Sequence, residues 1–507
     1  MTATEAPGAS RPAAAAIARG GLANLAGAAI SAVANLVLVV AVARAVPTDV
    51  AGRFFAATSA FIVLETACRL GTDTSTIYFI ARWKALGDVD RTRWCLRLAV
   101  RPTVLLSTLA AAVVVVLAPE LTRLIGDDTG ASVTLLRTLA LFLPVAVAYD
   151  VIISATRGFA VMRPTVLIDK IGRPCFQLLL VALVIAFGLD RSLGIAWAAP
   201  FVVALAGAWI ALRKLLPVVG NRRPDRAAMT EFWKFSIPRA VAGFAQIGLQ
   251  RADIVLMAAL RGVAAAAIYT AATRFLVVGQ FINQAISAPL QPRLSAALST
   301  GQHSHARDLY RLTTTWLVLA SWPVFGIAIA LADVYLDVFG GHYASGRSTV
   351  IVLSLAMLLA TAVGPVDNVI IMAGRASWNL WTAVGALVVN IGLNFILIPE
   401  YGLLGAALAW CAGIVVSNLI PLALAWFRLR LHPFGASTYR AYVVAGLCCI
   451  VVPLAVYWAA GASGFAAITG VTIGVLAYGA CVWHWRTAFE LNGAMRLRRP
   501  ARPREAT

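Results

Sequence analysis

Residues 54–81 read FFAATSAFIVLETACRLGTDTSTIYFIA. This stretch is long and apolar enough to cross a membrane, yet its interior carries Glu65, Arg69 and Asp73 at intervals of four residues. On one continuous helix, that spacing puts acid, base and acid on a single face. A charge in the middle of a bilayer costs about 2.5–3.5 kcal/mol. We therefore predict that this face looks at a partner helix or a water-filled cavity, and not at lipid.

The composition of the whole chain indicates a membrane protein. Of its 507 residues, 61% are hydrophobic and 13% are charged, and the mean hydropathy is +0.84, whereas soluble domains carry about 25% charged residues. The net charge is +20, but the basic residues fall between apolar stretches, which argues against binding to nucleic acid. The seven cysteines form no CxxC pattern and have no histidine at ligand spacing, so we predict neither a disulfide framework nor a metal site.

Apolar runs of about 20 residues predict fourteen helical spans. They cover residues 20–43, 54–81, 102–119, 133–156, 172–189, 193–212, 237–260, 266–290, 312–332, 349–373, 380–398, 403–427, 440–460 and 465–485. The predicted fold is therefore an all-α integral membrane protein.

Basic residues concentrate in alternate loops between these spans, at residues 82–101, 157–173 and 213–239. The second of these loops includes Lys170 and Arg173. The positive-inside rule assigns these loops and both termini to the cytoplasm. We expect a multi-pass protein of a bacterial plasma membrane.

Short motifs recur about 215 residues apart. The pattern VIIxAxR occurs at 151–157 and 369–375, and LGxAxA occurs at 193–198 and 404–409. A repeat of six spans predicts two parallel halves around a central cavity, followed by two extra helices. The predicted segments are a cytoplasmic tail (1–19), an N-terminal half (20–212), a basic cytoplasmic linker (213–236), a C-terminal half (237–427), helices 13 and 14 (428–485) and a basic cytoplasmic tail (486–507).

Polar side chains within the spans concentrate on the first two spans of each half. Besides the charges in 54–81, these spans contain Arg251, Asp253 and Arg274. Their amides are Asn24, Asn35, Gln246, Gln250, Gln280, Asn283 and Gln284. Such amides can also join helices, and the charges of 54–81 could form a ladder within one helix, so a structural interpretation stays open.

Two further carboxylates lie close before the two VIIxAxR motifs. Asp150 and Asp367 lie shortly before Arg157 and Arg375, near the ends of two predicted spans. Each could face the cavity or form an ion pair at the end of its own helix. The sequence does not choose between these two roles.

Several motifs are missing from the chain. No GxxxxGK[ST] motif is present, so an ATP-hydrolysing site is not predicted. No predicted outer loop is long enough to hold a pair of catalytic carboxylates, so we expect neither an enzyme nor catalytic residues. We expect no cofactor. The energy would come from an ion gradient, with H⁺ or Na⁺ as the coupling cation, from the membrane potential or from the substrate's own gradient.

Two local motifs carry a family resemblance. Leu70-Gly71, followed by Phe79-Ile80-Ala81 and Gly87-Asp88, resembles the end of the second span in Wzx-type flippases, and IPEYGLLGAA at 398–407 resembles the turn that opens their twelfth span. The chain thus resembles the oligosaccharide and polysaccharide flippases of the multidrug/oligosaccharidyl-lipid/polysaccharide exporter superfamily, which share a MATE-like fold.

This resemblance implies a function. Proteins of this kind move a polyprenyl-diphosphate-linked oligosaccharide from the cytoplasmic to the outer leaflet by alternating access, for the assembly of cell-surface polysaccharide. The implied partners are the lipid-linked glycan, membrane lipids, and a polysaccharide polymerase or glycosyltransferases. The first span has Asn24 and Asn35 but no arginine within it, unlike the related lipid II flippases, which argues against a peptidoglycan precursor as cargo.

The chemistry of such a cargo suggests roles for the polar residues. A diphosphate needs cations that stay charged when partly dehydrated, and arginine offers two parallel donors, so we expect Arg69, Arg274 and Arg251 to contact it. Glu65, Asp73 and Asp253 would hold these arginines in the empty protein or bind the coupling ion. The seven amides named above would hydrogen-bond the sugar hydroxyls.

Two alternatives remain open at this stage. A cation-coupled multidrug exporter of the same fold would need an acidic and aromatic cavity. A membrane-embedded glycan enzyme or an assembly scaffold belongs to a different class, and the short outer loops argue against the enzyme.

Overall fold

The computed structural model describes residues 11–88, 90–124, 130–216, 226–287, 290–461 and 463–489, and side chains from residue 26 onward. Every regular element in these ranges is helical. Twelve helices of the described chain are long and apolar enough to cross a membrane. The prediction of an all-α, multi-pass membrane protein is confirmed.

The number of fourteen spans stays a prediction. The predicted spans 172–189 and 237–260 are not among the twelve. They correspond to α6 (Arg173–Ala186), which is short, and to α9 (Arg226–Arg261), which carries several charges.

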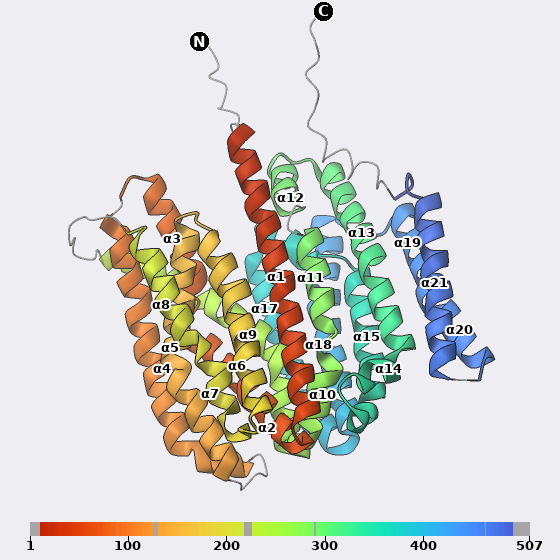
Figure 1. The fold of residues 1–507 in the computed structure, drawn as a ribbon. Coiled ribbons are helices and arrows are strands. Elements are labelled where there is room, and N and C mark those ends of the chain that lie inside the picture. Colours follow the sequence, from red (N-terminus) through yellow and green to blue (C-terminus); the bar gives the residue numbers. More distant parts are fainter. Residues whose placement is uncertain are drawn as a thin grey trace, which may run out of the picture. The chain divides into compact units, whose positions relative to one another are not determined.

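The chain forms two compact units, Met1–Ala271 and Ala272–Thr507. Figure 1 shows the helices of each unit. Those of unit 1 are α1 (Arg11–Ala45), α2 (Thr48–Cys68), α3 (Thr72–Ala85), α4 (Asp90–Leu124), α5 (Gly130–Gly158), η1 (Thr165–Gly172), α6, η2 (Asp190–Ser192), α7 (Leu193–Ala198), α8 (Pro200–Arg213), α9 and most of α10 (Val263–Thr273).

Helix α5 is the centre of unit 1. It packs against α2, α3, α4, α7, α8 and η1. Ala146, Val147, Val151 and Ala155 on this helix are completely buried, and these small or β-branched side chains let neighbouring helices approach closely. Asp150, also on α5, is therefore within reach of several helices.

Helices α3 and α9 pack along each other within unit 1. Ser236 Oγ lies 2.7 Å from Ser75 Oγ, and the rings of Tyr78 and Phe235 stack with centroids 4.7 Å apart. The contact begins at Gly71, where an added Cβ would overlap the backbone of α9. A glycine is required at this position because its φ is also positive, at 68°.

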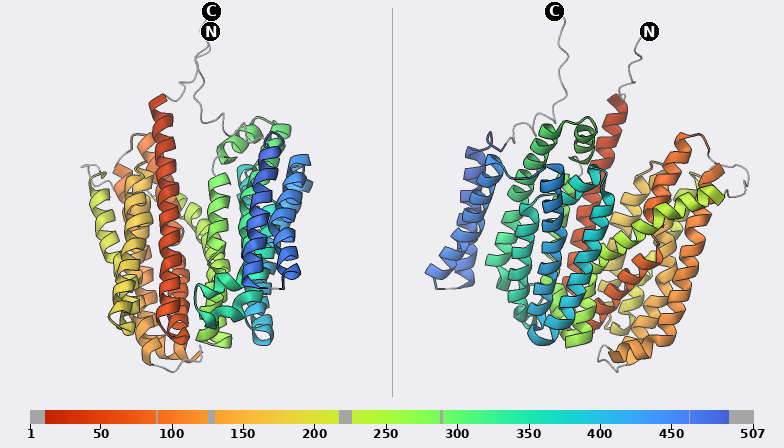
Figure 2. Two further views of the ribbon diagram at one scale, coloured as in Figure 1. Left: turned by 45° about the vertical axis from the view of Figure 1, so that its right-hand side comes forward. Right: turned by 180° about the vertical axis from the view of Figure 1, so that it is seen from behind.

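Unit 2 contains the remaining helices. They are α11 (Leu276–Ser287), α12 (Leu290–Ser299), α13 (His303–Ala330), α14 (Ala332–Asp337), η3 (Gly341–Gly346), α15 (Arg347–Ala362), α16 (Val366–Met372), α17 (Ala376–Tyr401), α18 (Leu403–Leu429), α19 (Ala436–Gly446), η4 (Leu447–Val451), α20 (Val452–Ala459) and α21 (Gly464–His484). Helices α19–α21 stand together at the edge of this unit, where they pack against α13 (Figure 2).

The two sequence repeats share an order of elements. Helix α2 begins at Thr48 and α10 at Val263, while α5 begins at Gly130 and α15 at Arg347. Both pairs of starts are about 215 residues apart, as the sequence repeat requires. The repeat is therefore structural as well as sequential.

The predicted segment boundaries stay predictions. The tail 1–19, the tail 486–507 and the linker 213–236 lie partly or wholly outside the described residues. The last part of the predicted linker belongs to α9, which begins at Arg226. Contacts group α9 with unit 1.

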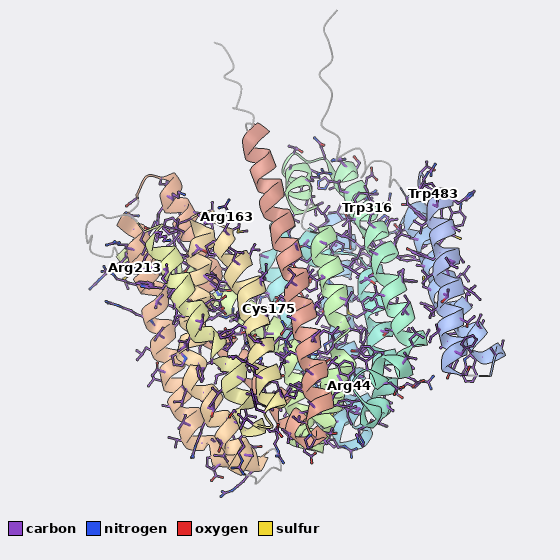
Figure 3. All side chains as sticks on the ribbon, in the orientation of Figure 1. Arg44, Arg163, Cys175, Arg213, Trp316 and Trp483 are labelled. Atoms are coloured by element: carbon purple, nitrogen blue, oxygen red, sulfur yellow. The ribbon has the colours of Figure 1, made fainter. Side chains whose placement is uncertain are left out.

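Arginines of two predicted cytoplasmic loops lie at the same end of unit 1. Figure 3 shows Arg163 and Arg213 at this end and Arg44 at the opposite end. This arrangement agrees with the charge asymmetry on which the predicted orientation rests.

Candidate functional site

Arg69 lies at a break in the helix and not on a continuous one. The prediction of an unbroken helix over 54–81 is wrong, because α2 ends at Cys68 and α3 begins at Thr72. Leu70 and Gly71 adopt positive φ values of 53° and 68°. The close approach of α9 at Gly71 favours the break. Glu65 and Asp73 therefore belong to two different helices, with Arg69 at the junction.

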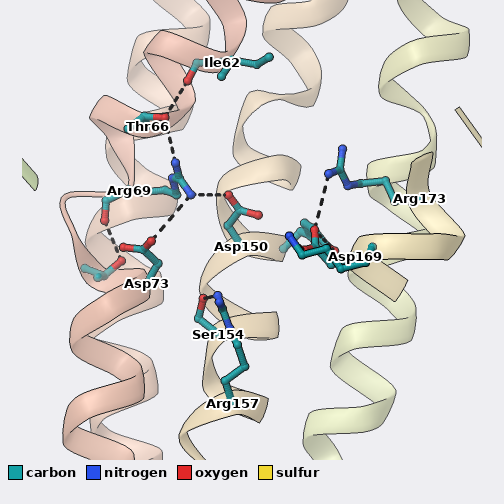
Figure 4. Close-up of polar contacts among 12 residues, drawn as sticks. Ile62, Thr66, Arg69, Asp73, Asp150, Ser154, Arg157, Asp169 and Arg173 are labelled. Atoms are coloured by element: carbon teal, nitrogen blue, oxygen red, sulfur yellow. Dashed lines mark hydrogen bonds and ion pairs between the residues drawn. The ribbon is translucent and has the colours of Figure 1, made fainter. Parts of the chain in front are cut away.

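The break turns Arg69 toward α5 (Figure 4). Its Nη1 donates to Asp150 Oδ2 at 2.9 Å and lies 3.9 Å from Asp73 Oδ2, while its Nη2 donates to Thr66 Oγ1 at 2.9 Å. Its Nε is buried and has no hydrogen-bond partner among the described residues. The predicted contact with Asp73 is thus present but long, and the main partner is Asp150.

Glu65 adds a second carboxyl group to this cluster. Its side chain is buried, with 7% exposed, and it lies within electrostatic reach of Asp150 and Arg69. Two carboxylates held close together repel each other, and binding of a proton by one of them relieves this repulsion. Glu65, Asp150 and Arg69 therefore form a site that can hold a proton as well as an ion pair.

A second charge cluster surrounds Asp169 on the π-helical segment η1. Asp169 accepts a hydrogen bond from Tyr149 Oη at 3.1 Å, and its carboxylate lies 3.0 Å from Lys170 Nζ and 3.6 Å from Arg173 Nη2. The Arg173 guanidinium also lies over the ring of Phe201, 5.0 Å from its centroid. Since Tyr149 directly precedes Asp150 on α5, the two clusters are adjacent.

This second cluster was not predicted from the sequence. Lys170 and Arg173 were predicted to be loop cations, whereas the structure places both on the helical segment formed by η1 and α6. An acid and a base four residues apart, Asp169 and Arg173, were the available signal. A π-helical turn is often associated with functional sites, and here it presents Asp169.

The other candidate residues of unit 1 lie outside these clusters. Gln246 and Gln250 are exposed on α9, and Arg251 is half-buried. Asp253 is buried and accepts a hydrogen bond from Tyr269 Oη at 2.9 Å. Asn35 is exposed on α1 and donates to Ser31 O, whereas the side chain of Asn24 lies outside the described residues.

A cavity of about 650 Å³ opens in unit 1 where α2, α5 and η2 begin. Arg53, Asp190, Arg191 and Thr134 provide its polar lining. Arg69 is not among the lining residues. None of these residues was predicted as a site residue, because Arg53, Asp190 and Arg191 were assigned to outer loops.

Unit 2 contains Arg274 and three candidate amides. Arg274 lies between α10 and α11, and its Nη2 is 3.4 Å from Thr273 Oγ1. Gln280, Asn283 and Gln284 are exposed on α11, and Asn283 Oδ1 accepts a hydrogen bond from Ser287 Oγ. Since Arg69 and Arg274 belong to different units, a shared chamber stays a prediction.

Among the described residues, no group of three His, Cys, Asp or Glu side chains lies close enough to hold a metal ion. The chemistry that the first cluster offers is ionic. A guanidinium held by two carboxylates, with 21% of its side chain exposed, can exchange those partners for another anion. The released carboxylates could then take up a proton or another cation.

Comparison with known proteins agrees with this architecture. In structure, the chain is similar to the lipid II flippase MurJ in an inward closed conformation, with a TM-score of 0.72 and 12% identity over 91% of this chain and 98% of that one. It is also similar to an inward-facing multidrug resistance MATE family transporter, with a TM-score of 0.64 and 16% identity over 79% of this chain and 94% of that one. A transporter of the MOP superfamily from Pyrococcus furiosus gives a TM-score of 0.56 and 17% identity over 82% of this chain and 95% of that one.

These similarities show that the chain has the fold of the MOP superfamily, as the sequence resemblance implied. No curated protein sequence matches the chain. The family model described as "Polysaccharide biosynthesis protein" matches residues 17–298, which is more than half of the chain. The chain therefore belongs to the polysaccharide biosynthesis protein family.

Proposed function

We propose that this protein moves a polyprenyl-diphosphate-linked oligosaccharide from the cytoplasmic to the outer leaflet of a bacterial plasma membrane by alternating access. In this proposal both termini are cytoplasmic, and the cargo serves the assembly of cell-surface polysaccharide. Family membership and a transporter fold support the general class. The observation that supports the cargo is the exchangeable ion pair between Arg69 and Asp150.

The cargo diphosphate would compete with Asp150 and Asp73 for Arg69. A guanidinium offers two parallel donors to a phosphate and stays charged when water is scarce. Its buried Nε, which has no partner among the described residues, is a further donor for that anion. Arg274 and Arg251 would supply more positive charge, and the amides of α9 and α11 would contact sugar hydroxyls.

Binding of the anion would change the charge of the acidic cluster. Once Arg69 turns to the diphosphate, Asp150 and Glu65 lose part of their positive partner, and the repulsion between them favours uptake of a proton. Release of the cargo in the other leaflet would restore the ion pair and release that proton. In this sequence a proton, or Na⁺ bound by the same carboxylates, leaves the cytoplasm together with the cargo. This step would work against an inward ion gradient, so the membrane potential or the cargo's own gradient would supply the energy.

The test compares Arg69→Ala and Arg69→Lys with the unchanged protein in cells. We expect the alanine variant to accumulate lipid-linked glycan on the cytoplasmic leaflet, and the lysine variant to show an intermediate defect, because lysine keeps the charge but loses the two parallel donors. Protein level in the membrane and thermal unfolding in detergent are measured in parallel. Undiminished transport by both variants at normal protein levels would refute the role of Arg69.

Because the fold is MATE-like, a multidrug exporter is the second candidate function, and the same cells can test it. A cation-coupled multidrug exporter would make cells resistant to cationic dyes and would not affect lipid-linked glycan. Growth of cells that express the protein in the presence of ethidium separates the two functions. Resistance to the dye without any change in the lipid-linked glycan would favour the exporter.

A further inference from the structure

A cluster of basic side chains lies at one end of unit 2, between α13 and the segment that joins α18 to α19. Arg307 and Arg311 lie one turn apart on α13. Arg307 Nη2 donates to the carbonyl oxygen of Arg430 at 2.9 Å, and Arg311 Nη2 lies 3.2 Å from His432 Nε2. The two guanidinium groups are thus held over residues 430–432.

This cluster has little negative charge of its own. The carboxylate paired with Arg311 is that of Asp308, at 3.9 Å, and the Asp308 side chain is 72% exposed, so the pair is weak. Arginine can only donate, so His432 Nε2 must accept in their contact and the imidazole is neutral. Burial, together with the nearby Arg311 and Arg307, lowers the pKa of His432 below its usual value and keeps the ring neutral.

The arginines also retain donors that nothing in the described chain uses. The Nε atoms of Arg307 and Arg311 are both buried without a hydrogen-bond partner. Buried polar groups are nearly always paired, so two guanidinium groups with unused donors are unusual. The Arg311 side chain is 30% exposed, so its outer Nη groups are open to an anion at the surface, and Arg307 adds a second positive charge one turn away.

The surroundings indicate where that anion comes from. Trp426, Phe427 and Tyr439 are 45%, 79% and 56% exposed next to the cluster. Exposed aromatic rings beside arginines at the ends of membrane helices are typical of the level of the lipid head groups. The anion concentrated at this level is phosphate, which arginine binds through two parallel hydrogen bonds.

We propose that Arg307 and Arg311, together with residues 430–432, bind a phosphate group at the membrane surface. The phosphate belongs to an anionic phospholipid or is free inorganic phosphate, since both present the same oxygen atoms. This site lies within unit 2 and does not depend on the cargo proposed above.

The test uses the full chain purified in detergent. The double variant Arg307→Ala/Arg311→Ala is compared with Arg428→Ala/Arg440→Ala, which removes the same charge from two exposed arginines of the same region. Binding of dioleoylphosphatidylglycerol and dioleoylphosphatidylcholine is titrated by native mass spectrometry. We expect the first variant to bind phosphatidylglycerol at least about tenfold more weakly than the unchanged protein, and the second to stay within about twofold.

A second titration identifies whether the bound phosphate comes from a lipid or from solution. It compares inorganic phosphate with chloride at equal ionic strength, without lipid, and measures the unfolding temperature. An unfolding temperature raised by phosphatidylglycerol but not by inorganic phosphate supports a lipid head group, whereas an increase with inorganic phosphate as well supports a free anion. Equal binding of both probes by the unchanged protein and the Arg307→Ala/Arg311→Ala variant would overturn the proposal. So would an equal loss in the two double variants.

A third variant guards against misfolding. Arg307→Lys/Arg311→Lys keeps both charges but loses the planar guanidinium groups, so we expect weaker binding of phosphatidylglycerol with an unchanged unfolding temperature. Binding as tight as that of the unchanged protein would show that the guanidinium donors are not used, and would contradict the proposal.

Discussion

The two units both contain the VIIxAxR motif but differ in the polar groups around it. In unit 1, Asp150 directly precedes the motif, is ion-paired with Arg69 and lies beside a second pair, Asp169 and Arg173. In unit 2, Asp367 lies two residues before the motif and makes no ion pair with any described residue. An amide pair lies next to it, in which Gln291 Nε2 donates to Asn368 Oδ1 at 2.9 Å.

The repeat therefore preserved the positions of helices and not their chemistry. Beside the VIIxAxR motif, unit 1 carries ionic groups that can exchange partners with an anion, whereas unit 2 carries a neutral amide pair. Under the proposed function these two places do different work, because only the first offers a cation to the charged part of the cargo.

The two units also differ in how a glycine turn is used. Gly71 in unit 1 has a φ of 68° and is pressed against α9, whereas Gly374 in unit 2 has a φ of 76° and has no other atoms near its missing Cβ. Only the first of these turns fixes the position of an arginine. Substitutions at the two glycines therefore separate backbone strain from helix contact.

The largest effect is expected for Gly71→Ala. A positive φ costs an alanine about 1 kcal/mol, and the overlap of its Cβ with the backbone of α9 adds about 2 kcal/mol. Gly374→Ala should lose only the stability that corresponds to the positive φ, because its Cβ overlaps nothing. Thermal unfolding in detergent compares the two variants, and equal losses would show that the approach of α9 to Gly71 does not matter.

The next largest effect is a difference in transport between variants of Asp150 and Asp367. Asp150→Asn leaves Arg69 without its main partner, and breaking one side of a partly buried pair costs about 2 kcal/mol, which corresponds to about 30-fold in an equilibrium. We expect a loss of transport of that order, and a loss within about threefold for Asp367→Asn. Cytoplasm-facing lipid-linked glycan is the measurement, with protein level as control. Equal defects would contradict different work at these two places.

A smaller effect concerns the strength of the pairs themselves. A double-mutant cycle on Arg69 and Asp150 should give a coupling of about 1–2 kcal/mol, since their side chains are about one-fifth exposed. The same cycle on Gln291 and Asn368 should give about 0.6 kcal/mol, as is typical of amides in membrane proteins. Both cycles are measured by unfolding in detergent. A larger coupling energy for Gln291 and Asn368 than for Arg69 and Asp150 would contradict the expected order of the two pairs.

Part of this site could be predicted from the sequence. The spacing of Arg69 and Asp73 by four residues predicted a contact, and the structure contains one at 3.9 Å. Local spacing could not predict Asp150 as the main partner, because that contact joins residues 81 positions apart and depends on how α5 packs. The repeat did single out Asp150 and Asp367, but gave no reason to expect that only one would be ion-paired.

The break at Leu70 and Gly71 shows a second limit. Glycine is common within membrane helices, so its presence in 54–81 did not by itself end the predicted span. The reason for the break lies in α9, whose backbone approaches Gly71 from more than 160 positions along the chain. Apolar length predicted the spans well, whereas turns set by a distant helix had no signal in the local sequence.

The smallest effect follows from a last contrast in charge. In unit 1, Arg69 and Arg173 each face a partly buried carboxylate, whereas in unit 2 Arg311 lies 3.2 Å from His432 Nε2 and Arg307 donates to the nearby carbonyl oxygen of Arg430. Burial and these two arginines lower the pKa of His432 in the folded protein, so the unfolded chain takes up a proton first as the pH falls below about 6.5. Stability should therefore be unaffected above that pH and should decrease below it, only slightly because the side chain is half-exposed and its charge is screened. His432→Gln removes the titrating group, so its unfolding temperature should decrease less between pH 7.5 and pH 5.5 than that of the unchanged protein. An equal decrease in both proteins would mean that the proton is taken up elsewhere, and that the cations of unit 2 do not act on His432 as the distances require.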